Sequence, residues 1–117
     1  MGGEVGGANR LRAVIEAHVA AVGAGDAGAL AALYAADGRV YDPAGGPPVV
    51  GRAAIAEHFA RWLSDPRDME IMSIVVTGYD AAVCFRATPA GGTPREVIDT
   101  MTFDEEAMIT VMRAYAE

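Results

Sequence analysis

The sequence predicts that two aspartates, Asp42 and Asp99, face the interior of the fold. In such a pair of carboxyl groups, one can serve as the acid and the other as the base. Asp99 alternates with Val97, Met101 and Phe103, and side chains two residues apart share one face of a strand. An ionised carboxylate is costly on an apolar face, so we expect the pKa of Asp99 to be raised. We interpret Asp99 as a functional acid. The alternative is an aspartate that binds backbone amides at a strand end.

Asp42 is the second candidate. It ends a short predicted strand, residues 39–42, in which Val40 faces the interior. Pro43 favours an extended backbone at Asp42, which would direct the carboxylate toward the same interior as the strand. The alternative is an aspartate that begins a turn before proline. Two carboxylates on one inner surface favour general acid–base catalysis.

Both histidines lie on the apolar faces of predicted helices. His18 belongs to the first helix, which we expect to form the floor of a cavity, and it is the third catalytic candidate. His58 stands beside Phe59 and Trp62, and we interpret it as a packed residue without a catalytic role. Two histidines without further ligands at a suitable spacing do not suggest zinc, so no metal and no other cofactor is expected.

Helical periodicity dominates the first half of the chain. The first predicted helix carries the stripe Leu11, Val14, Ile15, His18, Val19 and Val22. Asp26 can cap a second helix, whose stripe is Leu30, Leu33 and Tyr34. Asp37-Gly38 is typical of a turn. A third helix is expected from about residue 53, with the stripe Ile55, His58, Phe59, Trp62 and Leu63.

The second half of the chain predicts a sheet. Strands are expected over residues 70–77, 81–88, 96–103 and 108–116, with a hairpin loop at 88–94 and a turn at 104–107. Three helices followed by such a meander are typical of an α+β fold. We expect a cone-shaped roll, in which three N-terminal helices pack on a curved, mainly antiparallel β-sheet and enclose an apolar cavity.

The composition excludes several classes of protein. The 117 residues suit a single domain, expected over residues 10–117, after a glycine-rich flexible tail at residues 1–9. The net charge of −7 and the absence of lysine disfavour nucleic acid and anionic membranes as partners. No signal peptide and no run of about eighteen apolar residues is apparent. With Cys84 as the single cysteine there is no internal disulfide, so we expect a cytoplasmic protein.

Residues 23–28 match the pattern G-x-G-x-x-G of dinucleotide-binding loops. That motif requires a preceding strand, whereas an amphipathic helix is predicted here. We interpret these glycines as a connection between two helices and expect no nucleotide site.

Several segments resemble the bacterial Δ5-3-ketosteroid isomerases, and SnoaL-like and NTF2-like proteins share parts of the pattern. The resemblance covers nearly the whole chain from about residue 10. The segments that carry it are Gly25-Asp26, Leu33-Tyr34-Ala35-Ala36-Asp37, Val40-Tyr41-Asp42-Pro43, Pro47-Pro48, Gly51-Arg52, Ala54-Ile55, Ile98-Asp99, Phe103-Asp104 and Met112-Arg113-Ala114. It implies a cone-shaped roll that usually forms a homodimer. We expect the dimer to use the sheet face that carries Ile98 and Thr100.

The resemblance also implies an isomerase that transposes a C=C bond, of the 3-oxo-Δ5 to Δ4 steroid type. Asp42 matches the family's general base. Asp99 matches the acid of its oxyanion hole, a known case of a carboxylic acid kept neutral so that it can donate a hydrogen bond, here to a dienolate. His18 falls where the family has its oxyanion tyrosine. It could donate as a neutral imidazole, or it could pair as an imidazolium with ionised Asp99.

Other positions depart from the family pattern. Phe59 replaces a supporting tyrosine, His58 replaces a pocket phenylalanine, and Tyr34 keeps the third tyrosine of that network. We expect a small hydrophobic substrate, steroid-like or polyketide-like, to contact Val22, Tyr34, His58, Phe59, Leu63, Val83, Phe85, Met101, Met112 and Ala114. The alternatives are a SnoaL-like polyketide cyclase or epoxide-opening enzyme, and a non-catalytic NTF2-like domain that binds a ligand or dimerises.

Overall fold

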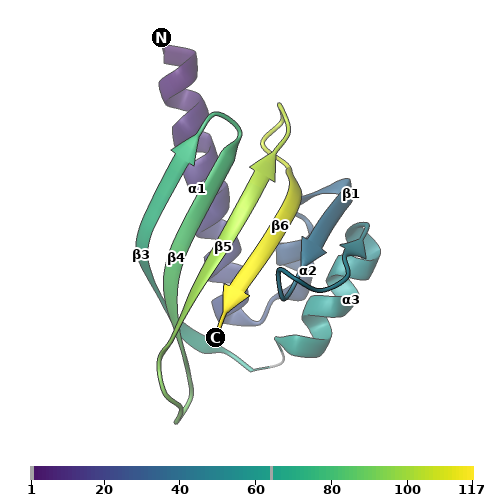
Figure 1. Ribbon diagram of the computed structural model, residues 1–117, viewed down its shortest axis with the longest axis vertical. Helices are drawn as coiled ribbons and strands as arrows, with labels where there is room; N and C mark the ends of the chain where they lie inside the picture. Colours follow the sequence, from purple (N-terminus) through teal and green to yellow (C-terminus); the bar gives the residue numbers. More distant parts are fainter. Residues whose placement is uncertain (1, 64) are drawn as a thin grey trace.

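The computed structural model describes residues 2–63 and 65–117, with side chains described from Gly7 onward. In this part of the chain, three helices pack on a six-stranded sheet, which confirms the predicted α+β class (Figure 1). In chain order the elements are α1 (Gly2–Ala24), α2 (Ala27–Ala31), β1 (Tyr34–Tyr41), β2 (Val49–Val50), α3 (Arg52–Trp62), β3 (Arg67–Thr77), β4 (Asp80–Pro89), β5 (Arg95–Phe103) and β6 (Ile109–Ala116).

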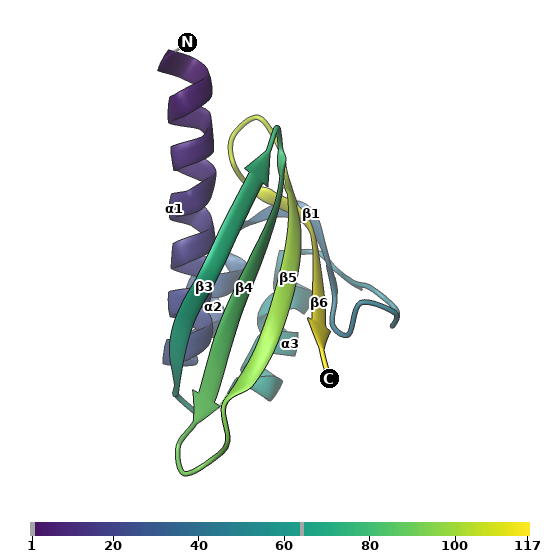
Figure 2. The ribbon, with the colours of Figure 1, turned by 60° about the vertical axis from the view of Figure 1, so that its left-hand side comes forward.

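The sheet is mixed, curved and not closed. Its strand order is β2-β1-β6-β5-β4-β3, and every neighbouring pair is antiparallel except β1 with β6, which run parallel. The long helix α1 runs alongside β3 (Figure 2), where the Arg12 guanidinium donates a hydrogen bond to the carbonyl of Ile74 at 3.2 Å. The parallel pairing places the end of β1 next to β6, which lies between β1 and β5.

The core lies between the helices and the inner face of the sheet. It draws fully buried side chains from both layers, among them Ile15, Leu30, Val40, Ile55 and Ile109. Along β4 the buried residues alternate: Ala81, Val83, Phe85 and Ala87. Burial of this apolar surface is the main favourable term in folding, and it fixes the positions of the polar side chains on the same face.

The connection between α1 and α2 is a helix–helix link, as expected for residues 23–28. The Asp26 carboxylate accepts a hydrogen bond from the amide of Ala29 at 3.0 Å and so caps α2. Gly25 has a φ of 69°, and an added Cβ would lie 2.6 Å from the carbonyl oxygen of Leu63. Only glycine fits this conformation and this close approach.

Two expectations about the first half were wrong. Tyr34 begins β1 instead of ending a second helix, because α2 stops at Ala31 and Tyr34 pairs with Ile109 of β6. Asp37-Gly38 is an irregularity within β1, where the register against β6 shifts, and not a turn before the strand. In both cases, pairing with a distant strand overrides local preference.

The helix α1 begins at Gly2, within the segment predicted as a flexible tail. The division of the chain into a tail at 1–9 and a domain at 10–117 stays a prediction. Within the described residues, no helix combines the length and the apolar character that a membrane span requires.

Candidate active site

Asp99 lies in the middle of the sheet with its side chain turned into the core. It is 4% exposed, and its strand partners are Val83 of β4 and Ala114 of β6. Burial, and secondarily the negative charge of Asp42, raises the pKa of Asp99 from 3.8 to about 7. The carboxyl group therefore carries its proton for much of the time near neutral pH, as the alternation of β5 predicts.

Asp42 follows β1 directly, and the parallel pairing places it near Asp99. Tyr41 pairs with Arg113, and the amide of Ala44 donates to the carbonyl of Ala114 at 2.9 Å. Because Ala114 is also the strand partner of Asp99, the two aspartates flank the same stretch of β6. The Asp42 side chain is 40% exposed, in contrast to Asp99. The two carboxyl groups thus share one region in very different environments.

His18 projects from α1 into the core and is fully buried. Its Nε2 lies 2.8 Å from the hydroxyl oxygen of Tyr34. Burial lowers the pKa of His18 from 6.5 to about 3, so the imidazole is neutral. Burial thus favours the first of the two states that the sequence left open, a neutral imidazole, over an imidazolium paired with ionised Asp99.

The hydroxyl of Tyr34 contacts His18, and the charges of both aspartates affect its pKa. Burial, and then the negative charges of Asp99 and Asp42, raises the pKa of Tyr34 well above 10. The phenol therefore stays protonated. The ring of Phe59 packs against this group, with its centroid 6.4 Å from that of His18 and 6.4 Å from that of Tyr34.

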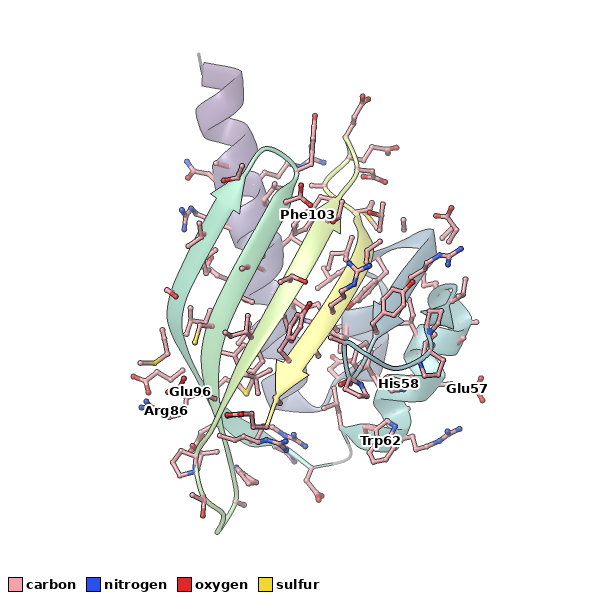
Figure 3. All side chains as sticks on the ribbon, viewed as in Figure 1. Glu57, His58, Trp62, Arg86, Glu96 and Phe103 are labelled. Carbon is pink, nitrogen blue, oxygen red and sulfur yellow. The ribbon has the colours of Figure 1, made fainter. Side chains whose placement is uncertain are left out.

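His58 contacts Asp42, which sequence reasoning missed. Its Nε2 lies 3.3 Å from Oδ2 of Asp42, and its ring centroid lies 5.1 Å from that of Phe59 and 6.5 Å from that of Trp62. Figure 3 shows His58 and Trp62 together on α3. The interpretation of His58 as a packed residue without a catalytic role stays a prediction. The available signal was a polar ring on an apolar stripe. The sequence does not show that Asp42, directly after β1, lies next to the apolar stripe of α3.

The residues expected to contact a substrate gather in the same core. Tyr34, Phe59, Leu63, Val83, Phe85, Met101 and Met112 are buried in it, whereas Val22 and Ala114 are half-buried and pack against it. The aspartates, the histidines and these apolar side chains thus lie on α1, α3, β1, β4, β5 and β6, except for Asp42 and Leu63, which directly follow β1 and α3. Their contact with a substrate stays a prediction.

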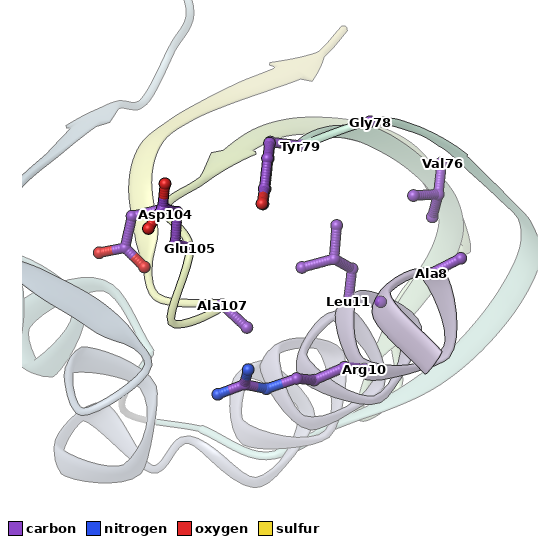
Figure 4. A pocket seen from close by; sticks show the side chains of 10 residues that line it. Ala8, Arg10, Leu11, Val76, Gly78, Tyr79, Asp104, Glu105 and Ala107 are labelled. Carbon is purple, nitrogen blue, oxygen red and sulfur yellow. The ribbon is translucent and has the colours of Figure 1, made fainter. Parts of the chain in front are cut away.

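Three hollows are formed by described residues, and none of them is lined by His18, Asp42 or Asp99. One of about 730 Å³ lies between the start of α1 and two β-turns, lined by residues that include Arg10, Leu11, Tyr79, Asp104 and Ala107 (Figure 4). Two others, of about 520 and 370 Å³, also lack the three predicted catalytic residues. The shared apolar cavity around the aspartates therefore stays a prediction.

Within the described residues, no group of three or more His, Cys, Asp or Glu side chains could hold a metal ion. The groups that can do chemistry here are instead a buried acid, an exposed carboxylate, a neutral imidazole and a phenol. Such a set can transfer protons and donate hydrogen bonds.

Comparison with known proteins shows the family to which the chain belongs. Residues 15–112 match the model of the SnoaL-like domain. The chain belongs to the SnoaL-like family. It is 37% identical over 108 residues to a steroid Delta-isomerase of Nocardioides simplex, covering 90% of this chain and 88% of that protein.

Among solved structures, the fold of this SnoaL-like protein is similar to that of SalBIII. SalBIII is an epoxide hydrolase/cyclase-like enzyme with a role in pyran ring formation in the polyether salinomycin. The TM-score is 0.80 at 21% identity, over 93% of this chain and 92% of SalBIII. At this identity the likeness shows a shared fold.

Proposed function

We propose that this protein is an isomerase that moves a proton within a small hydrophobic carbonyl compound, of the 3-oxo-Δ5 to Δ4 steroid type. The observation that carries the proposal is the pair of aspartates. Asp99 is buried with its pKa raised to about 7, whereas Asp42 nearby is 40% exposed. Carboxyl groups in such different environments can serve as acid and base in one reaction. The 37% identity to a steroid Delta-isomerase supports the substrate class.

Asp42 is the general base in this proposal. Its carboxylate takes a proton from the carbon between the ketone and the double bond, which leaves a dienolate. The same carboxyl group then returns the proton to the far carbon of the former double bond. A positioned base of this kind contributes about 10²–10⁴ to the rate.

Asp99 and His18 stabilise the dienolate oxygen. Protonated Asp99 donates one hydrogen bond from a buried position, where it competes with little water. The neutral imidazole of His18 donates the second, in place of the tyrosine of related isomerases. Removal of one such donor costs about 10²–10³ in turnover in well-studied oxyanion holes.

The test is an absorbance assay with a 3-oxo-Δ5 steroid, since isomerisation creates a conjugated enone. We expect enzyme-dependent formation of this chromophore. An epoxide of the polyether-precursor type, assayed in parallel, should remain unopened. Opening of the epoxide without isomerisation would favour the cyclase alternative. Binding of the steroid without turnover would favour a non-catalytic domain.

A further inference from the structure

The hydrogen bond between His18 and Tyr34 bears on which nitrogen of the imidazole carries the proton. The ring is fully buried and neutral, so one nitrogen is a donor and the other an acceptor. Nε2 faces the hydroxyl of Tyr34 at 2.8 Å. Nδ1 is buried and has no hydrogen-bond partner among the described residues.

Two arrangements of protons are possible. If Nε2–H donates to Tyr34, the lone pair of Nδ1 is unsatisfied, and the hydroxyl proton of Tyr34 needs another acceptor. If Tyr34 donates to Nε2, the hydroxyl is satisfied and only the Nδ1–H group lacks a partner. An unsatisfied buried polar group is costly, and the second arrangement leaves one such group instead of two, so it is favoured.

The surroundings of Tyr34 support this choice. Within the described part of the chain, Nε2 of His18 is the hydrogen-bond partner of the Tyr34 hydroxyl, which is itself fully buried. The phenol keeps its proton because burial and two nearby carboxylates disfavour a phenolate. Phe59, packed against both rings, offers no polar atom that could compete.

We propose that Tyr34 is a positioning residue that holds His18 in the tautomer with its proton on Nδ1. The Nδ1–H group then remains as an unsatisfied donor in a buried site. A ligand oxygen that carries negative charge would satisfy it. Within the proposed isomerase, on which this last step rests, Nδ1–H is thus the group that contacts the dienolate.

The tautomer can be measured without any substrate, by two-bond ¹H–¹⁵N correlation NMR at pH 7. The chain has two histidines, and a His58→Gln variant assigns the signals. We expect His18 to show a protonated Nδ1 and a bare Nε2. In Tyr34→Phe the Nε2–H form should appear, while the His58 signals stay unchanged. A protonated Nε2 in the wild-type protein would overturn the inference, and the wild-type spectrum alone is sufficient to show it.

Kinetics provide a second readout, which separates positioning from a purely structural role. Tyr34→Phe should lower kcat with little change in KM, and it should have little further effect in a His18→Ala background, because the two changes remove one unit. Equal losses in both backgrounds would contradict the coupling. If the wild-type protein does not isomerise the steroid, the proposed function fails, whereas the NMR result still decides the tautomer.

Discussion

Replacing Asp99 by asparagine removes an ionisation that burial makes costly, so its effect on stability should depend on pH. The side chain is 4% exposed, and its pKa is raised from 3.8 to about 7. Each pKa unit corresponds to about 1.4 kcal/mol, so this difference corresponds to an upper limit of about 4 kcal/mol. Asparagine keeps the shape of the side chain but carries no titrating proton.

The direction follows from proton binding. The folded protein holds the Asp99 proton more tightly than the unfolded chain does, so this group's contribution to stability is complete below about pH 4. The contribution is lost as pH rises toward 7 and changes little above that. Relative to wild type, the free energy of unfolding of Asp99→Asn should therefore increase by up to about 4 kcal/mol between pH 4 and pH 8.

Urea unfolding followed by circular dichroism at pH 4, 6 and 8 measures this difference. Asp37→Asn is the matched control, since Asp37 is exposed on β1. Its stability relative to wild type should change little with pH. A constant difference between wild type and Asp99→Asn over the whole range would refute the argument that burial holds the proton on Asp99.

Three further predictions concern activity and assembly. Isomerase turnover should fall as pH rises through about 7, because ionised Asp99 cannot donate; a rate profile from pH 5 to 9 that only rises would contradict this. His18→Ala should lower kcat by about tenfold or more, and His18→Tyr should keep or raise it, in the same steroid assay; an unchanged kcat in His18→Ala would remove His18 from the mechanism. The chain should form a homodimer through the sheet face that carries Ile98 and Tyr115, which are 45% and 47% exposed. Sedimentation velocity at tens of micromolar should show this dimer, and a monomer at that concentration would argue against it.

Sequence patterns predicted the parts of the site that depend on local periodicity. The alternation along β5 indicated that Asp99 faces the core, and the helical stripe placed His18 inside. Each conclusion requires only that a strand repeats every two residues and a helix about every 3.6. The same periodicity misled at Tyr34, because Leu30, Leu33 and Tyr34 also fit a helix.

Contacts between distant segments were beyond sequence reasoning. Tyr34 is a strand residue because it pairs with Ile109, which lies 75 positions later in the sequence. The contact between His58 and Asp42 depends on how α3 packs against the end of β1. The lowered pKa of His18 depends on its complete burial, which favours the neutral imidazole over the charged one.

The role of Asp42 as the base is the central claim, and the turnover of Asp42→Asn tests it most directly. Asp37→Asn, with the same change at an exposed site on β1, the strand that Asp42 follows, is the control. In the absorbance assay with a 3-oxo-Δ5 steroid, Asp42→Asn should lose about 10²–10⁴ in kcat, whereas Asp37→Asn should retain wild-type turnover. Full activity in a folded Asp42→Asn protein would contradict the account.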